Sequence, residues 1–180
     1  NQYLWTRDQV AYPFFDTGIL TFALKGDNTY SVTRGPNFDS VANVVIPTSY
    51  NGIPVTTIVD NAFASRTKLV TIEIPDTIKI IGTGAFTGCT ALESINVYEV
   101  EGNHDVFYGS DQGALIRYDM GTTYLEIFPR AKTGTYVMSD EIQVIRNKAF
   151  QYSYIDKVVI GKGVTTIIKY GFYYCYGLDE

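Results

Sequence analysis

A regular spacing of aromatic residues constrains the fold of this chain more than any other feature. Four Ala-Phe or Gly-Phe pairs place phenylalanines 23 and 22 residues apart, at Phe63 and Phe86 and again at Phe150 and Phe172. The fifth residue before each phenylalanine is isoleucine, and the eighth is valine or isoleucine. A fixed period of this length is typical of solenoids, in which each repeat buries its apolar side against its neighbours.

Each repeat also contains an alternating apolar segment, which predicts a β-strand. The five segments begin at Val44, Ile72, Ile95, Tyr136 and Val158. Alternation places every second side chain on the same face of a strand, so one set is buried and the intervening set faces outward. We expect one continuous parallel sheet with about 5 Å between neighbouring strands, and the repeated phenylalanines should form an interior ladder.

The repeat resembles the BspA-type leucine-rich repeat, which reads much like L-x-x-I-x-I-P-x-x-V-x-x-I-G-x-x-A-F-x-x-C. Residues 69–89, "LVTIEIPDTIKIIGTGAFTGC", follow this pattern in order, and the match is close over residues 41–97 and 133–178. The resemblance implies a right-handed β-rich leucine-rich-repeat solenoid with a parallel sheet on its concave face. It also implies a secreted or cell-surface location and a role in protein interaction or adhesion.

Two segments interrupt the repeats and read as hairpins. Residues 18–34, "GILTFALKGDNTYSVTR", alternate around a turn at Lys25–Asn28, and "GALIRYDMGTTYLEIFP" alternates around Asp-Met-Gly-Thr. The first would cover the open edge of the solenoid. The predicted organisation is therefore an N-terminal segment or linker (1–17), a hairpin cap (18–40), repeats one and two with the start of the third (41–97), an insertion with a β-hairpin (98–134) and further repeats (135–180).

The last repeat in residues 135–180 is truncated, since the chain stops at the first strand position of another repeat. An uncovered solenoid edge exposes apolar side chains and unpaired backbone. We therefore expect either that the natural chain continues or that the protein self-associates through this edge.

The stretch "IGTGAFTGC", residues 81–89, has three glycines before a cysteine. This composition is compatible with a phosphate-binding loop or with a loop that holds a nucleophilic cysteine. The sister repeats contradict both readings. The position of Gly82 holds Val59, Arg146 or Ile168, and that of Cys89 holds Arg66, Ser153 or Cys175. We interpret the glycines as dispensable in the other copies of the repeat and Cys89 as a buried packing residue, and we expect two free thiols because the cysteines lie several repeats apart.

Charge and metal-ligand content argue against several function classes. The formal net charge is −5 without a basic cluster, which disfavours nucleic acid as a partner, and no apolar run is long enough to cross a bilayer. The one histidine, His104, lies in an acidic loop that we interpret as solvated rather than as a calcium site; its carboxylates are Glu99, Glu101, Asp105 and Asp111. We predict no catalytic residues, no metal and no cofactor.

The outward-facing strand positions remain as the candidate partner-binding surface. They are Asn43, Val45, Thr71, Glu73, Ser94, Asn96, Thr135, Val137, Lys157 and Val159. Their mixed polar and aliphatic character suits contact with a protein, such as a host extracellular-matrix protein or another cell-surface protein. The alternatives are a structural spacer or docking domain of a larger secreted protein and, more weakly, a carbohydrate-binding module.

A second candidate surface consists of tyrosines near the C-terminus. They are Tyr152, Tyr154, Tyr170, Tyr173, Tyr174 and Tyr176. Aromatic rings with a polar tip are enriched in recognition surfaces. Stacking between neighbouring repeats explains the same residues, and this is the interpretation that we favour from the sequence.

Overall fold

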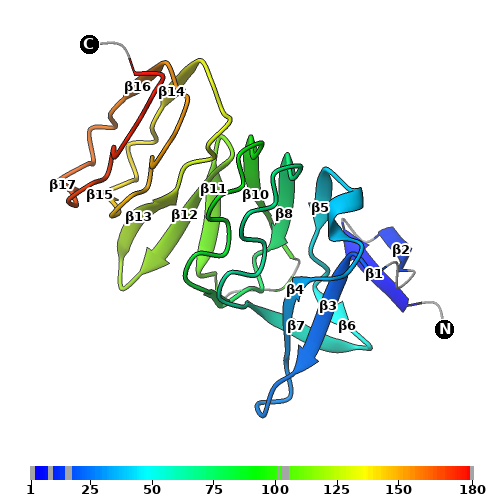
Figure 1. Ribbon diagram of the computed structural model, residues 1–180. Coiled ribbons are helices and arrows are strands. Elements are labelled where there is room, and N and C mark those ends of the chain that lie inside the picture. The colour runs from blue at the N-terminus through cyan, green and yellow to red at the C-terminus, as the bar shows by residue number, and fades with distance from the viewer. Residues whose placement is uncertain (1–2, 8–9, 15–17, 101, 103–105, 179–180) are drawn as a thin grey trace.

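A computed structural model describes residues 3–7, 10–14, 18–100, 102 and 106–178. The described residues form a β-solenoid whose repeats are stacked along the molecule from the N-terminal to the C-terminal end (Figure 1). Each repeat contributes a strand to one side of the solenoid, and most repeats contribute a second strand to the other side, as the repeat pattern predicts. In the N-terminal segment, β1 (Tyr3–Arg7) and β2 (Val10–Phe14) pair antiparallel.

The first side of the solenoid consists of the alternating strands of the repeats, all parallel. They are β5 (Asn43–Val45), β8 (Thr71–Pro75), β10 (Ser94–Tyr98), β14 (Thr135–Val137) and β16 (Lys157–Val159). Equivalent residues lie side by side across the strands, since Asn43 pairs with Thr71 and Thr71 with Ser94. The same register continues from Thr135 to Lys157.

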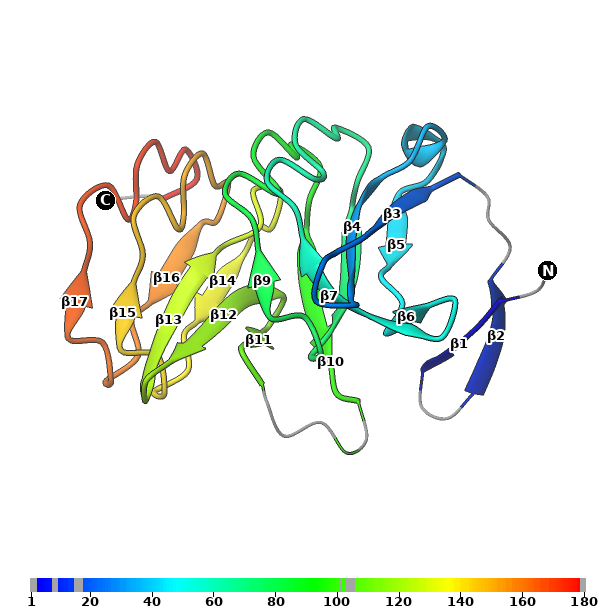
Figure 2. The same cartoon turned by 90° about the horizontal axis from the view of Figure 1, so that it is seen from below.

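The second side is built from the second strands of the repeats and from the hairpins of residues 20–34 and 114–127 (Figure 2). In the N-terminal half, the sheet comprises β3 (Leu20–Leu24), β4 (Tyr30–Arg34), β6 (Ser49–Tyr50), β7 (Ile53–Ile58) and β9 (Ile80–Ile81). In the C-terminal half, it comprises β11 (Tyr108–Asp111), β12 (Ala114–Asp119), β13 (Thr122–Ile127), β15 (Val144–Ile145) and β17 (Thr166–Ile167). The antiparallel pairs β3–β4 and β12–β13 coincide with the segments that read as hairpins.

Stacked phenylalanines form the core, which confirms the expected interior ladder. The ring centroids of Phe63 and Phe86 are 5.7 Å apart, and those of Phe150 and Phe172 are 4.5 Å apart. Two further rings belong to the ladder: Phe38 stacks on Phe63 at 5.2 Å, and Phe128 stacks on Phe150 at 4.6 Å. Neither ring belongs to an Ala-Phe or Gly-Phe pair, so the pattern of these pairs does not predict them, although Phe128 lies one period of 22 residues before Phe150.

The continuous sheet expected on the first side is wrong, because the insertion separates β10 from β14. Its tip, residues 111–113, occupies the space between these strands. Ile95 of β10 donates its backbone N–H to the Gly113 carbonyl at 2.8 Å, and Gln112 donates to the Val137 carbonyl of β14 at 2.6 Å. The insertion thus takes the place of a strand, and the first side consists of a three-stranded sheet and a two-stranded sheet.

Two positions in each of four repeats adopt left-handed backbone, whether or not the residue there is glycine. Two residues before the repeated phenylalanine, Gly84 has a φ of +70° and Lys148 one of +61°. Two residues after it, the conformation recurs at Gly88 and Tyr152. Glycine adopts this conformation without the steric cost that other residues incur.

Gly82 itself leaves no room for a side chain, although the equivalent positions of the other repeats carry one. A Cβ atom added at Gly82 would lie 2.3 Å from the backbone nitrogen of Asp60 in the preceding repeat. Backbone atoms cannot yield to such a contact, so a side chain here requires the chain to move.

Candidate functional site

The N-terminal part of the predicted face, on β5, β8 and β10, is a polar surface whose side chains bond to one another. The Thr71 hydroxyl donates to Asn43 Oδ1 at 2.7 Å, and the Ser94 hydroxyl donates to Asn96 Oδ1 at the same distance. Most of the candidate residues here are half-buried; the set is Asn43, Val45, Thr71, Glu73, Ser94 and Asn96. These internal hydrogen bonds must compete with any bond to a partner, which lowers the gain from binding.

The C-terminal part of the face, on β14 and β16, is more accessible. Thr135, Val137, Lys157 and Val159 are all exposed, and the two valines retain 54% and 41% of their accessible surface. Strand pairing places Val137 beside Val159 and Thr135 beside Lys157. The result is a small apolar centre with a cationic side chain next to it.

The tip of the insertion divides the predicted surface between these two parts. Asp111 at the tip accepts hydrogen bonds from the Tyr136 hydroxyl at 2.6 Å and from the Ser139 backbone N–H at 3.1 Å. Burial of the Tyr136 side chain and its hydrogen bond to the Asp111 carboxylate raise the pKa of Tyr136, so this tyrosine stays neutral and keeps donating. Strand pairing brings Val137, Val159 and Lys157 together, and the insertion tip separates them from the residues on β10.

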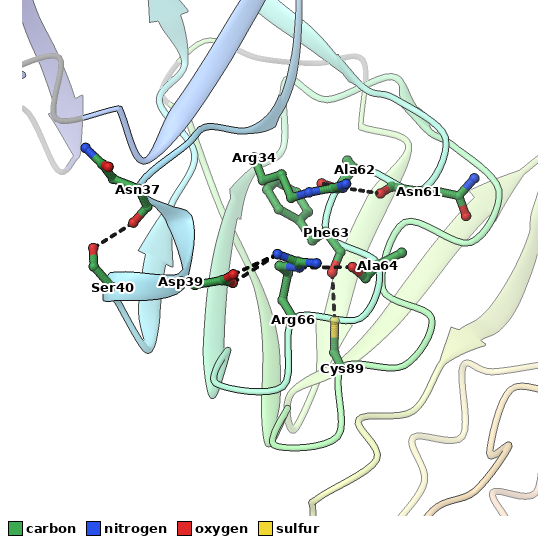
Figure 3. Close-up of polar contacts among 10 residues, drawn as sticks. All are labelled: Arg34, Asn37, Asp39, Ser40, Asn61, Ala62, Phe63, Ala64, Arg66 and Cys89. Atoms are coloured by element: carbon green, nitrogen blue, oxygen red, sulfur yellow. Dashed lines mark hydrogen bonds and ion pairs between the residues drawn. The ribbon is translucent and has the colours of Figure 1, made fainter.

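Cys89 faces the core, which confirms its interpretation as a packing residue (Figure 3). Its thiol donates to the Phe63 carbonyl of the preceding repeat at 3.1 Å, and Cys175 repeats the contact with the Phe150 carbonyl at 3.2 Å. Both thiols are free. Burial raises the pKa of Cys89, and it raises that of Cys175 to about 11. Neither thiol is a thiolate at neutral pH, and only the thiolate is an effective nucleophile.

The remaining polar contacts around Cys89 tie neighbouring repeats together (Figure 3). Arg66 forms an ion pair with Asp39 at 2.9 Å, and Arg34 donates to the backbone carbonyls of Asn61 and Ala62. These contacts join the 3₁₀-helix η1 (Phe38–Ser40) and β4 to the following repeat. Their role is structural.

Metal-ligating side chains do not gather in the described part of the chain. No group of three or more His, Cys, Asp or Glu residues is placed there to hold an ion. His104, Glu101 and Asp105 of the acidic loop lie outside the described residues. Across the described residues, no helix has the length and apolar character needed to cross a bilayer.

The C-terminal tyrosines form one continuous cluster, which we call the tyrosine patch: Tyr152, Tyr154, Tyr170, Tyr173, Tyr174 and Tyr176. Tyr152, Tyr174 and Tyr176 lie nearly parallel, with centroids 5.6–6.2 Å apart. Tyr173 continues the cluster, since its centroid is 4.2 Å from that of Tyr174 and 5.3 Å from that of Tyr170. A hydrogen bond with Tyr174 is the main cause that raises the pKa of Tyr173. The expected stacking between repeats is therefore present.

Much of the tyrosine patch nevertheless remains exposed, because the rings lie along the turns at the C-terminal end. Tyr174 and Tyr176 keep 54% and 58% of their accessible surface, and Tyr154 and Tyr170 are also exposed. The guanidinium of Arg130 lies 5.4 Å from the Tyr152 ring and 5.7 Å from the Tyr154 ring. Lys169 Nζ lies 4.8 Å from the Tyr170 ring.

Comparison with known proteins identifies relatives of this architecture. Residues 56–179 match the family described as BspA type leucine rich repeat region, in six copies. No curated protein matches the chain in sequence. The leucine-rich repeat protein of T. pallidum is similar in structure, with a TM-score of 0.54 and 22% sequence identity over 91% of this chain and 68% of that one.

Two other solved structures show weaker similarity. A leucine-rich cell surface protein of Faecalibacterium prausnitzii has a TM-score of 0.38 and 16% identity, covering 93% of this chain and 76% of its own. The pneumococcal vaccine antigen PcpA has a TM-score of 0.41 and 15% identity, covering 99% and 69%. The similarity of fold therefore rests on the T. pallidum structure, and the family assignment rests on the repeat match over residues 56–179.

Proposed function

This chain belongs to the BspA-type leucine-rich-repeat family, and we propose that it is a non-enzymatic module that binds another protein through β14 and β16. The observation that carries the proposal is the exposed pair Val137 and Val159 with Lys157 next to it. An apolar centre with a polar margin is the usual composition of a protein-binding surface. Stacked strands present such a surface on a rigid support.

The proposal narrows the binding face that the sequence predicts. The polar side chains on β5, β8 and β10 form two hydrogen-bonded pairs, Thr71 with Asn43 and Ser94 with Asn96. On β14 and β16, the valines have no polar group to satisfy and gain from burial. Burying apolar surface contributes about 25 cal/mol per Å², so the C-terminal part of the face supplies more of the binding energy.

We further propose a secreted or cell-surface location and adhesion to a host extracellular-matrix protein or to another surface protein, as the repeat type implies. The protonated, buried Cys89 is consistent with a role without catalysis. The alternative, a structural spacer in a larger secreted protein, predicts no partner for this face. A binding experiment therefore separates the two.

The test is binding to a panel of purified extracellular-matrix proteins by surface plasmon resonance. The double variant Val137→Asp/Lys157→Glu should weaken binding at least about tenfold, since a charge is buried in the apolar centre and the cation is reversed. Its matched control is Leu24→Asp/Lys68→Glu, which makes the same types of change at exposed positions elsewhere. Binding to no panel member, or equal weakening by the control, contradicts the proposal.

A further inference from the structure

The tyrosine patch carries a conformational cost that the repeat does not require. Tyr152, Tyr170 and Tyr174 have φ values of +62°, +68° and +51°. Gly84 and Gly88 occupy the same two positions in an earlier repeat, with the same left-handed backbone. Asn61, Ser65 and Lys148 also hold these left-handed positions, so the backbone belongs to the repeat and only the choice of bulky tyrosines is particular to the C-terminal repeats.

Stacking offsets part of this cost but does not account for the exposed rings. Tyr152 stacks on Tyr174, and this contact joins two neighbouring repeats. Tyr174 and Tyr176 still leave more than half of their accessible surface in solvent. Exposed aromatic side chains gathered on one surface usually mark a recognition site.

Three cations lie at the margin of the patch, although the whole chain carries a net charge of −5. Arg130 and Lys169 lie over rings of the patch. Lys148 lies next to Tyr170, because its backbone N–H donates to the Tyr170 carbonyl at 3.2 Å.

We propose that the tyrosine patch binds an acidic oligosaccharide. The C–H face of a pyranose ring is apolar and packs on an aromatic face, while the tyrosine hydroxyls bond to sugar hydroxyls. A carboxylate or sulfate on the sugar pairs with Lys148, Lys169 or Arg130. This activity is separate from protein binding by β14 and β16, and each can fail without the other.

A single-stranded nucleic acid also combines aromatic stacking with cations, but the charge of this surface fits it less well. Binding sites for single strands combine stacking with a basic groove that follows the phosphates over several nucleotides. The patch has three cations at its margin, in a chain of net negative charge. Isolated anionic groups on a sugar match this number better.

The experiment is isothermal titration calorimetry of the full chain with three hexasaccharides. Hyaluronan presents carboxylates alone, chondroitin sulfate presents carboxylates and sulfates, and chitohexaose is neutral. We expect at least one acidic hexasaccharide to bind about tenfold more tightly than chitohexaose, because each additional charged contact contributes on this scale. The tighter of the two acidic sugars identifies the anion.

Two variants separate the aromatic from the ionic contribution. Tyr174→Gly/Tyr176→Ala should weaken binding of the acidic sugar about tenfold or more. Its melting temperature should stay within about 4 °C of the parent, because relief of the left-handed backbone offsets lost stacking. Lys148→Gln/Lys169→Gln should weaken binding and reduce its salt dependence. The control Lys68→Gln/Lys162→Gln removes the same charge at exposed positions outside both proposed surfaces and should bind like the parent.

Several results overturn the proposal. They are no binding of either acidic hexasaccharide, equal affinity for chitohexaose, equal weakening by the Lys68→Gln/Lys162→Gln control, and tighter binding of an oligothymidine of six nucleotides. Loss of sugar binding only together with a large fall in melting temperature overturns it as well, since the tyrosines would then be structural. Loss of matrix-protein binding has no bearing on this outcome.

Discussion

Replacing Lys148 with glycine should stabilise the protein, because Lys148 occupies a backbone conformation that favours glycine. Its φ is +61°, and Gly84 holds the equivalent position of an earlier repeat with a φ of +70°. Left-handed backbone costs an L-residue about 1–2 kcal/mol, whereas glycine loses about 0.5–1 kcal/mol more conformational entropy on folding. The free energy of unfolding should therefore rise by about 0.5–1 kcal/mol.

Little else changes at this site. The Lys148 side chain is exposed, and the hydrogen bond at this position runs from its backbone N–H to the Tyr170 carbonyl at 3.2 Å. Lys148→Gly retains that bond. Lys148→Ala is the matched control, since it removes the same charge and the same long side chain but keeps the Cβ atom that clashes. Its stability should stay within about 0.5 kcal/mol of the parent.

Urea unfolding followed by circular dichroism measures the difference. With an m-value of about 2 kcal/mol/M, the glycine variant should shift the midpoint upward by about 0.25–0.5 M at unchanged m. A glycine variant no more stable than the alanine variant would refute the reasoning. The left-handed positions would then be unstrained, and the conformational cost assigned to Tyr170 and Tyr174 would also disappear.

Three further predictions concern the core, the insertion and the C-terminal edge. Phe150→Ala should lower the free energy of unfolding by about 3–5 kcal/mol, because its ring is fully buried between two others; denaturant unfolding measures this, and a loss below 1 kcal/mol would contradict the ladder as the core. Asp111→Ala should cost about 1.5–3 kcal/mol, since the buried Tyr136 hydroxyl loses a charged acceptor, and Tyr136→Phe should remove most of that cost in a double-mutant cycle. Ile167 is 52% exposed at the position of the buried Ile145, so light scattering should detect concentration-dependent self-association that Ile167→Lys abolishes; a parent chain that is monomeric at every concentration would refute it.

The insertion is a structural joint between two halves of the solenoid rather than a separate appendage. The core divides into two apolar clusters that meet at β12. Leu115 packs in the N-terminal cluster, and its neighbours Ala114 and Ile116 pack in the C-terminal one. Because its two faces pack in different clusters, β12 connects the core of the N-terminal repeats to that of the C-terminal repeats. This arrangement explains how the stack continues although the repeat pattern is interrupted.

Much of the candidate site could be anticipated, because strand alternation is a local property. The spacing of Ile72, Ile74 and their equivalents identifies the buried positions, so Val137, Lys157 and Val159 follow as outward-facing. Their relative accessibility could not be anticipated. It depends on hydrogen bonds between side chains of neighbouring strands and on the insertion tip, and these involve residues distant in sequence.

The sequence by itself determined the repeat, the buried and exposed positions of its strands, and the stacked phenylalanines, because a solenoid depends mainly on contacts at one fixed period. Only the tertiary structure decided where that period is broken. The insertion places Gly113 beside Ile95, although these residues are 18 apart and off the period, because its tip folds back between β10 and β14. The contacts of Phe128 with Phe150 and of Gly82 with Asp60 do lie at a separation of 22 residues. Periodicity allows these two contacts, and backbone packing decides that a ring fits at the first and that no side chain fits at the second.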